Sequence, residues 1–223
     1  MNWNKLVACL SADSSPNLEK FHPKVIFDPT RRPESIYIDT VRNRNLSPND
    51  IRIFLNNWGR MRMPVNMNEL ESYLEMNNNF KKLLSYRFET ANFDEIGYDV
   101  KALFGLFNNL DKRGGEAPVA RAKTLHVLYP NLLVMWDNAI LISYGCSNKK
   151  IPLAERYLQF QKRVQFEGEK VLQSLKNEKQ LSDNLSASKL LCKSLYNDAK
   201  TFVKIMDEYN FVKYTLCSNE AWI

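Results

Sequence analysis

Apolar residues repeat with the period of an α-helix through most of the second half of the chain, and this periodicity constrains the fold more than any other feature. Over residues 92–110, positions spaced four and three apart define one helix face, made of Ile96, Val100, Leu103, Phe107 and Leu110. Residues 116–129 indicate another helix, which Pro130 closes. The chain is therefore expected to be mostly α-helical.

The last third of the chain predicts two longer helices. The first is expected from Leu153 to about Leu175, and the polar stretch 176–188 that follows is typical of a loop. The second carries an apolar stripe made of Leu191, Leu195, Ala199, Phe202, Met206 and Tyr209. We expect this helical pair, within residues 153–223, to pack on the core. Its stripes also offer a surface for a homo-oligomer.

The N-terminal part is less regular. Prolines interrupt residues 1–45, so this segment is expected to be irregular, and the alternation of Ser35–Asp39 favours one short N-terminal strand pair. A helix start follows, with Ser47 as the N-cap, Pro48 at the first helical position and Asp50 near the positive helix end. This helix is expected to end at Gly59.

Composition excludes several classes of protein. The 223 residues suffice for a single α-helical domain over 1–223 that needs neither disulfide nor metal. Only 7 glycines and 9 prolines occur, which argues against collagen-like and many-turned β structures. No apolar run approaches the roughly 20 residues that cross a bilayer, so no membrane partner is expected.

Cysteine and histidine usage argues against a metal centre. Cys9, Cys146, Cys192 and Cys217 are far apart and the chain has 2 histidines, so no zinc-ligand spacing occurs. With no export signal recognisable, the cysteines are expected to be reduced and the protein cytoplasmic. The common nucleotide-binding, hydrolase and zinc-protease motifs do not occur, and no cofactor is predicted.

Residues 114–140 combine features that can carry chemistry. Gly114 and Gly115 precede a helix that opens with Arg121 and Lys123, and Asp137 stands at the start of the next helix. A helix start with basic side chains can hold a phosphate, and an acid just beyond it can stabilise a nearby positive charge.

This segment resembles the core of the helix-hairpin-helix DNA glycosylases, in which a glycine-containing hairpin holds the DNA backbone and an apolar run ends in an essential Asp. Arg121-Ala122-Lys123-Thr124 resembles the family's helix opening, and Val134-Met135-Trp136-Asp137 resembles the run into the Asp. The resemblance implies that Asp137 stabilises an oxocarbenium-like sugar cation. It also implies that Lys123 lies where bifunctional members keep their Schiff-base lysine.

The same residues have plain structural interpretations. Asp137 is placed to cap its helix, and Lys123 and Arg121 are placed to be solvated on a helix face. His126 is the third candidate catalytic residue, but its position beside the apolar face also suits a hydrogen-bonded core histidine.

A basic excess points to nucleic acid as a partner. Lys and Arg number 31 against 25 Asp and Glu, giving a formal charge of +6. The candidate contacts are Arg60, Arg62, Lys112, Arg113, Gly114, Gly115 and Arg121. Arginine dominates the basic residues between Lys24 and Arg62, and Tyr37 and Trp58 in that stretch are candidates to stack on bases.

Three acids form a further candidate. Asp94 and Glu95 lie near a helix start, where negative charge is favourable, and Glu95 and Asp99 are one turn apart, close enough to share a divalent cation. Compensation of the helix dipole accounts for the same pattern, and no metal site is predicted.

The leading prediction is a nucleic-acid-interacting helical protein with glycosylase-like base excision. One alternative is a non-enzymatic protein–protein interaction module that uses the C-terminal helices. Another is an enzyme acting on a small anionic substrate, with His126 as acid–base and arginines as clamps.

Overall fold

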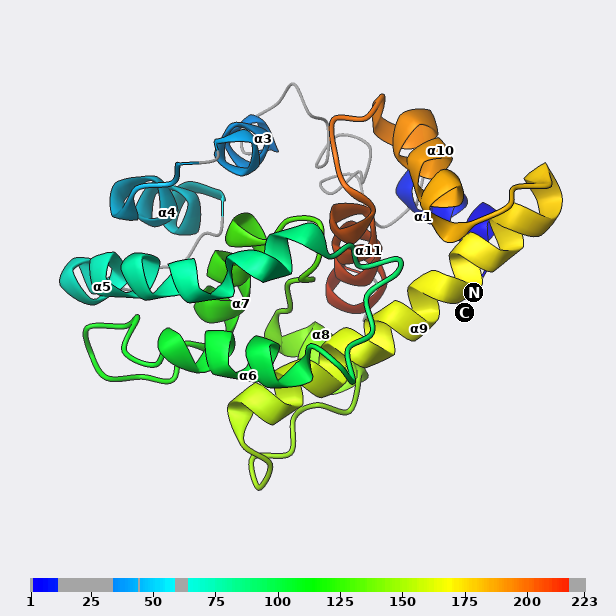
Figure 1. Cartoon of the computed structure of the whole chain (residues 1–223). Coiled ribbons are helices and arrows are strands. Elements are labelled where there is room, and N and C mark those ends of the chain that lie inside the picture. Colours follow the sequence, from blue (N-terminus) through cyan, green and yellow to red (C-terminus); the bar gives the residue numbers. More distant parts are fainter. Residues whose placement is uncertain (1, 12–33, 44, 59–63, 217–223) are drawn as a thin grey trace.

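The computed structural model describes residues 2–11, 34–43, 45–58 and 64–216, and over these ranges the chain is mostly helical (Figure 1). The α-helices are α1 (Trp3–Ser11), α3 (Glu34–Arg42), α4 (Pro48–Ile53), α5 (Met67–Asn77), α6 (Gly97–Leu106), α7 (Pro118–Leu128), α8 (Asn138–Ser143), α9 (Leu153–Lys179), α10 (Asn184–Tyr196) and α11 (Phe202–Asn210). Two π-helical turns, η1 (Phe54–Trp58) and η3 (Phe211–Leu216), and the 3-10 helix η2 (Asn78–Ser85) extend them. The predicted multi-helix, mostly α fold is confirmed.

The predicted N-terminal strand pair is wrong. Residues 35–39 lie within α3, which buries Tyr37 and Ile38 on one face. The ring of Tyr37 packs on the ring of His126 at a centroid distance of 5.5 Å, and this contact comes from a distant part of the chain. A five-residue alternation is too short to outweigh such packing. Residues 1–45 also contain α1, so the predicted irregular segment is helical over most of the part that the structure describes.

The predicted helix start at Ser47 is confirmed as a capping box. The Asp50 backbone N–H donates to Ser47 Oγ at 3.2 Å, and the Ser47 N–H donates to Asp50 Oδ2 at 2.9 Å. The helix changes to the π-helical η1 at Phe54, and Gly59 lies outside the described residues.

The longest helix, α9, supports much of the molecule by contacting α6, α10 and α1. It runs to Lys179, and α10 begins at Asn184, where Asp183 accepts from the Ser186 N–H at 2.7 Å. The loop predicted over 176–188 is therefore only residues 180–183. Figure 1 shows α9 as the yellow helix that runs under α6 towards α10.

The second predicted C-terminal helix is two helices, so the helical pair is a set of three. Asn197 and Asp198 take left-handed backbone conformations with φ of 48° and 63°, which end α10. The chain then turns into α11, whose nine residues are all buried. The apolar stripe of α11 is covered by the chain itself, which leaves it unavailable to a second copy.

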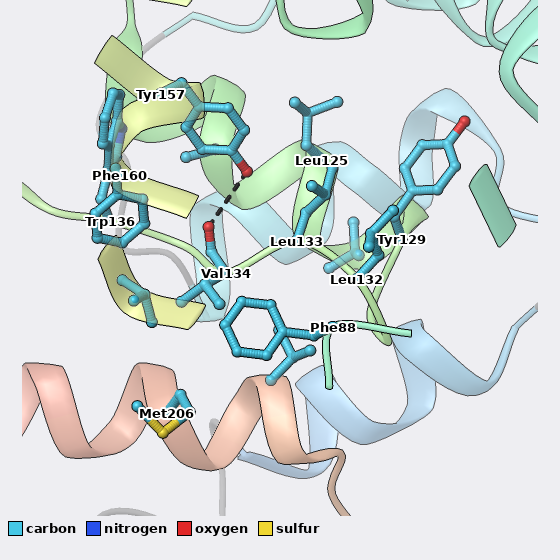
Figure 2. Packing of buried hydrophobic residues seen from close by; sticks show 14 of the residues in the cluster. Phe88, Leu125, Tyr129, Leu132, Leu133, Val134, Trp136, Tyr157, Phe160 and Met206 are labelled. Carbon is cyan, nitrogen blue, oxygen red and sulfur yellow. Dashed lines mark hydrogen bonds between the residues drawn. The ribbon is translucent and has the colours of Figure 1, made fainter. Parts of the chain in front are cut away.

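Aromatic residues fill the centre around an extended segment, residues 133–137 (Figure 2). Side chains satisfy the backbone of Val134 in place of a strand: its N–H donates to Gln161 Oε1 at 2.9 Å, and its carbonyl accepts from Gln161 Nε2 at 2.8 Å and Tyr157 Oη at 3.2 Å. Trp136 packs edge-on against Tyr157 at a centroid distance of 5.1 Å. These contacts fix the direction in which the chain enters α8.

Candidate functional site

Asp137 caps α8. Its Oδ1 accepts from the Ile140 backbone N–H at 2.8 Å, and its Oδ2 accepts from the Thr215 hydroxyl of η3 at 2.6 Å. The predicted acid at a helix start is therefore present, half-buried, with a partner on each oxygen. The contacts fit its interpretation as a cap, and its proposed role in base release stays a prediction.

His126 is a buried core histidine. The Leu133 carbonyl, 2.7 Å from Nδ1, can only accept, so Nδ1 carries the proton and Nε2 accepts from the Tyr37 hydroxyl at 2.8 Å. Burial lowers the pKa of His126 to about 3. An imidazole ring that stays neutral and inaccessible at neutral pH does not suit acid–base catalysis. Tyr37 is also fully buried, so its ring cannot stack on a base as predicted.

The two basic residues of α7 differ from the predicted solvated pair. Arg121 is only 5% exposed; its Nη2 donates to the Asn108 carbonyl at 3.0 Å and its guanidinium lies 5.5 Å from the centre of the Phe104 ring. It is therefore a core residue and not a contact for phosphate. Lys123 is half-buried and its charge acts on Asp207 of α11. Asp137 and His126 thus have separate sets of hydrogen-bond partners.

The loop between α6 and α7 keeps its predicted exposure. Lys112, Arg113, Gly114 and Gly115 are all exposed, and the Arg113 guanidinium donates to both oxygens of Asp111, at 3.0 and 2.8 Å. The Lys112 N–H donates to the Pro64 carbonyl at 3.0 Å. Arg60 and Arg62, like Lys24, Arg31, Arg32, Arg44 and the side chain of Trp58, lie outside what the structure describes.

Asp94, Glu95 and Asp99, the three acids considered as a possible cation site, each contact a different residue. Asp94 pairs with Lys162, Asp99 pairs with Lys82 at 2.8 Å, and Glu95 accepts from Asn92 Nδ2 at 2.8 Å. Among the described residues, no three or more His, Cys, Asp or Glu side chains are grouped to hold a metal ion. The described cysteines, Cys9, Cys146 and Cys192, are free thiols.

The structure also contains a buried ionic cluster that the sequence did not predict. It consists of Glu34, Lys200, Lys204, Asp207 and Glu208. Lys200 Nζ lies 2.9 Å from Glu34 Oε2 and 2.6 Å from Glu208 Oε1, and Lys204 Nζ lies 3.1 Å from Asp207 Oδ2 and 3.3 Å from Glu208 Oε1. Glu208 therefore bridges both ammonium groups.

The electrostatics of the cluster keep Lys204 charged. Burial alone lowers the pKa of Lys204, but Glu34, Glu208 and Asp207 together raise it above the ordinary value. Burial raises the pKa of Asp207 to about 6, against the opposing effect of Lys204. A protonated lysine is no nucleophile, so Lys204 offers no group for covalent chemistry and its contacts help to position α11.

The sequence contains a pattern for this cluster, but the pattern predicts a solvated helix face and not a buried one. Lys200, Lys204 and Glu208 are spaced four apart, so they share one face of a helix, and such a polar face is normally solvated. It is buried here because Glu34, from the opposite end of the sequence, meets it. No local pattern reveals that contact.

A second feature that the sequence did not reveal is a surface hollow of about 490 Å³. We call it the basic hollow and define it by Tyr144, Lys162, Arg163, Phe166, Lys213 and Tyr214. These residues come from the end of α8, the middle of α9 and η3. Cations and rings that are far apart in sequence are therefore gathered at one place on the surface.

Local geometry shapes the wall between α8 and α9. Gly145 has a φ of +64°, and an added Cβ there would stand 2.9 Å from Arg163 Nη1, so glycine permits both the turn and the close approach. Arg163 Nη1 donates to the Tyr144 carbonyl. The Tyr144 hydroxyl donates to Asn210 Oδ1 at 2.8 Å, which ties this wall to the end of α11.

On the η3 side, Lys213 is exposed and lies 4.7 Å from the centre of the Tyr214 ring. Burial lowers the pKa of Lys213. Hydrogen bonding to Tyr214 and the charges of the neighbouring tyrosines raise it by more, so the pKa lies above its ordinary value. Phe166 of α9 is 58% exposed, an unusual position for a large apolar ring, and Lys170 Nζ lies 4.0 Å from its centre.

No known protein family, curated protein or solved structure matches this chain. In the part of the chain that the structure describes, no helix has the length and apolar character needed to cross a membrane.

Proposed function

We propose that this protein binds single-stranded nucleic acid through the basic hollow. The observation that carries the proposal is the convergence of three cations and three aromatic rings from α8, α9 and η3 on one open surface. Cations that follow a phosphate backbone, together with rings on which bases stack, are the two elements of single-strand recognition.

The charge of the hollow suits a polyanion. Lys162, Arg163 and Lys213 stand against Glu167, which also lines it, so three positive charges less one negative leave +2. Lys162 pairs with Asp94, whose side chain is 82% exposed, and such a surface pair contributes little and is readily exchanged for a phosphate. The overall charge of +6 adds long-range attraction.

The rings of the hollow supply the base contact. Phe166 exposes most of its ring, and burying it against a base removes apolar surface from water that the fold leaves uncovered. Tyr144 and Tyr214 face each other with ring centres 5.5 Å apart in an edge-to-face arrangement, which fixes both rings. Duplex bases are stacked already, so rings of this kind favour a single strand over a duplex.

The test is a titration of a fluorescently labelled oligothymidine and of a duplex of equal length, followed by anisotropy at several salt concentrations. We expect tighter binding of the single strand and a slope of log K against log salt of about −2, since each of three phosphate contacts contributes about −0.7. Equal or tighter binding of the duplex, or no binding of either, would contradict the proposal.

Variants separate the two parts of the site. Phe166→Ala is expected to weaken single-strand binding by about 5- to 100-fold with an unchanged salt slope, because it removes stacking and no charge. Lys213→Gln is expected to flatten the slope by about 0.7. Lys193→Gln, an exposed lysine of α10 outside the hollow, is the matched control and should leave both quantities unchanged.

A further inference from the structure

A second concave site, separate from the basic hollow, lies where α3, α10 and the start of α11 meet. It has a volume of about 370 Å³, within the range of about 300–1,000 Å³ that is usual for small-molecule sites. Three exposed cations stand at its rim: Arg42 at the end of α3, Arg87 after η2, and Lys189 on α10. We call it the cation-rimmed cleft.

The rim cations are available to a ligand. Among the described residues, neither Arg42, Arg87 nor Lys189 forms an ion pair. Arg87 Nη1 donates a hydrogen bond to Asn131 Oδ1 at 3.3 Å, which is a long contact to a neutral group. Glu89 and Asp198 also line the cleft. The three rim cations outnumber these two carboxylates by one positive charge. Lys200 lines it as well, but the ionic cluster already neutralises that lysine.

Part of the cleft wall is apolar, and the buried polar residues Glu89, Ser188 and Lys200 line the rest of it. Phe202 and Val203 are buried at its floor and Val41 is half-buried beside Arg42. Burial raises the pKa of Cys192, which also lines the cleft, to about 12, so its thiol is protonated and offers no nucleophile. Cys192 therefore supplies apolar surface to the cleft and no reactive group.

From this geometry we infer that the cation-rimmed cleft binds a phosphomonoester, with the phosphate on Arg42 and Arg87 and the carbon body of the ligand on the apolar floor. The planar guanidinium fork matches two phosphate oxygens at once, and a dianionic monoester gains more from two such partners than a monoanionic backbone phosphate does. The source of the monoester is a small organic phosphate or the phosphorylated end of a nucleic-acid strand.

Isothermal titration of the whole chain with adenosine 5′-monophosphate tests the inference, with adenosine as the phosphate-free probe. We expect the monophosphate to bind and adenosine to bind at least about tenfold more weakly. Arg42→Gln and Arg87→Gln should each weaken binding of the monophosphate by about tenfold or more. Arg52→Gln is the matched control, because Arg52 is an exposed arginine of α4 that bonds to Asn49 and lies outside the cleft.

Equal affinity for the two probes, or unchanged affinity in both arginine variants, would overturn the assignment. Both residues are exposed, so circular dichroism and thermal melting of the variants should match the wild type, and the result does not depend on a folding defect. Lys213→Gln should keep its affinity for the monophosphate and Arg87→Gln its affinity for oligothymidine, which separates failure here from failure of the basic hollow.

Competition then distinguishes the two sources. If the strand end is the ligand, a short 5′-phosphorylated oligonucleotide displaces the bound monophosphate and its 5′-hydroxyl counterpart does not. If neither displaces it, the cleft is assigned to a small phosphomonoester. Equal displacement by both would show recognition of backbone phosphates and would contradict the inference.

Discussion

At the scale of single residues, Asp137 joins two parts of the chain with its two oxygens, one to the first turn of α8 and the other to Thr215 of η3. Asn is as good an N-cap as Asp, so Asp137→Asn is expected to change the free energy of unfolding little, whereas Asp137→Ala should lower it by about 1–2 kcal/mol. Urea unfolding of the two variants measures the difference.

The same variant tests the resemblance to the glycosylases. Duplexes that carry a panel of damaged bases are incubated with the wild type and with Asp137→Asn, and release of free base is followed. The resemblance predicts release by the wild type and its loss in the variant, since an amide cannot balance a sugar cation. Absence of release from every duplex would remove base excision from the function of this protein.

His126 makes the stability of the protein sensitive to acid. Its folded pKa of about 3 lies below the value of 6.5 expected in the unfolded chain, so the unfolded state takes up a proton that the native state refuses. Stability is therefore lost as the pH falls from 6.5 towards 3, by at most about 5 kcal/mol. Asp207 acts in the opposite direction, because its folded pKa of about 6 is raised, and it adds stability as the pH falls from 6 to 4.

Urea unfolding at a series of pH values separates the two groups. His126→Gln keeps a donor for the Leu133 carbonyl and an acceptor for the Tyr37 hydroxyl, and we expect it to lose stability less steeply below pH 6.5 than the wild type. Asp207→Asn should show a steeper loss between pH 6 and 4. If His126→Gln and the wild type lose stability in parallel, the histidine is not the source of the acid sensitivity.

At the scale of elements, α11 is held by buried charges as well as by apolar packing. Glu208 bridges Lys200 and Lys204 and accepts from the Tyr196 hydroxyl at 2.5 Å. Glu208→Gln leaves the two buried ammonium groups with less compensation, and we expect the free energy of unfolding to fall by about 3–5 kcal/mol. Glu169→Gln, an exposed position of α9, should change it by less than about 0.5 kcal/mol.

A loss below about 1 kcal/mol in Glu208→Gln would mean that Glu34 and Asp207 alone compensate both lysines. Chemical denaturation at neutral pH is the measurement, and near-ultraviolet circular dichroism confirms that each variant keeps the native packing.

Helix starts and helix stripes were the elements that the sequence predicted best, because both depend on neighbours a few residues away. Ser47, Pro48 and Asp50 determine the beginning of α4 by themselves. The strand prediction at Ser35–Asp39 failed because Tyr37 is positioned by His126, and the long second C-terminal helix failed because Asn197 and Asp198 take left-handed conformations that their types permit without requiring.

At the scale of the whole molecule, the all-helical class followed from periodicity, but the surfaces that can bind a ligand did not. The basic hollow depends on Lys213 of η3 lying beside Arg163 of α9, and the cation-rimmed cleft depends on Arg42 meeting Lys189. These residues are far apart in the sequence, and no spacing rule brings them together. The sequence has a basic excess, but the nucleic-acid contacts predicted from it were placed elsewhere, and the polyanionic partner stays a prediction.

The charges of the ionic cluster also determine how α11 is turned about its own axis. A slip of one residue would rotate Glu208 by about 100° and carry it away from both ammonium groups. The cluster thus fixes the rotation of α11 about its axis. Because the cation-rimmed cleft lies at the start of α11 and the basic hollow lies beyond its end, the buried charges help to set the distance and orientation between the two surfaces.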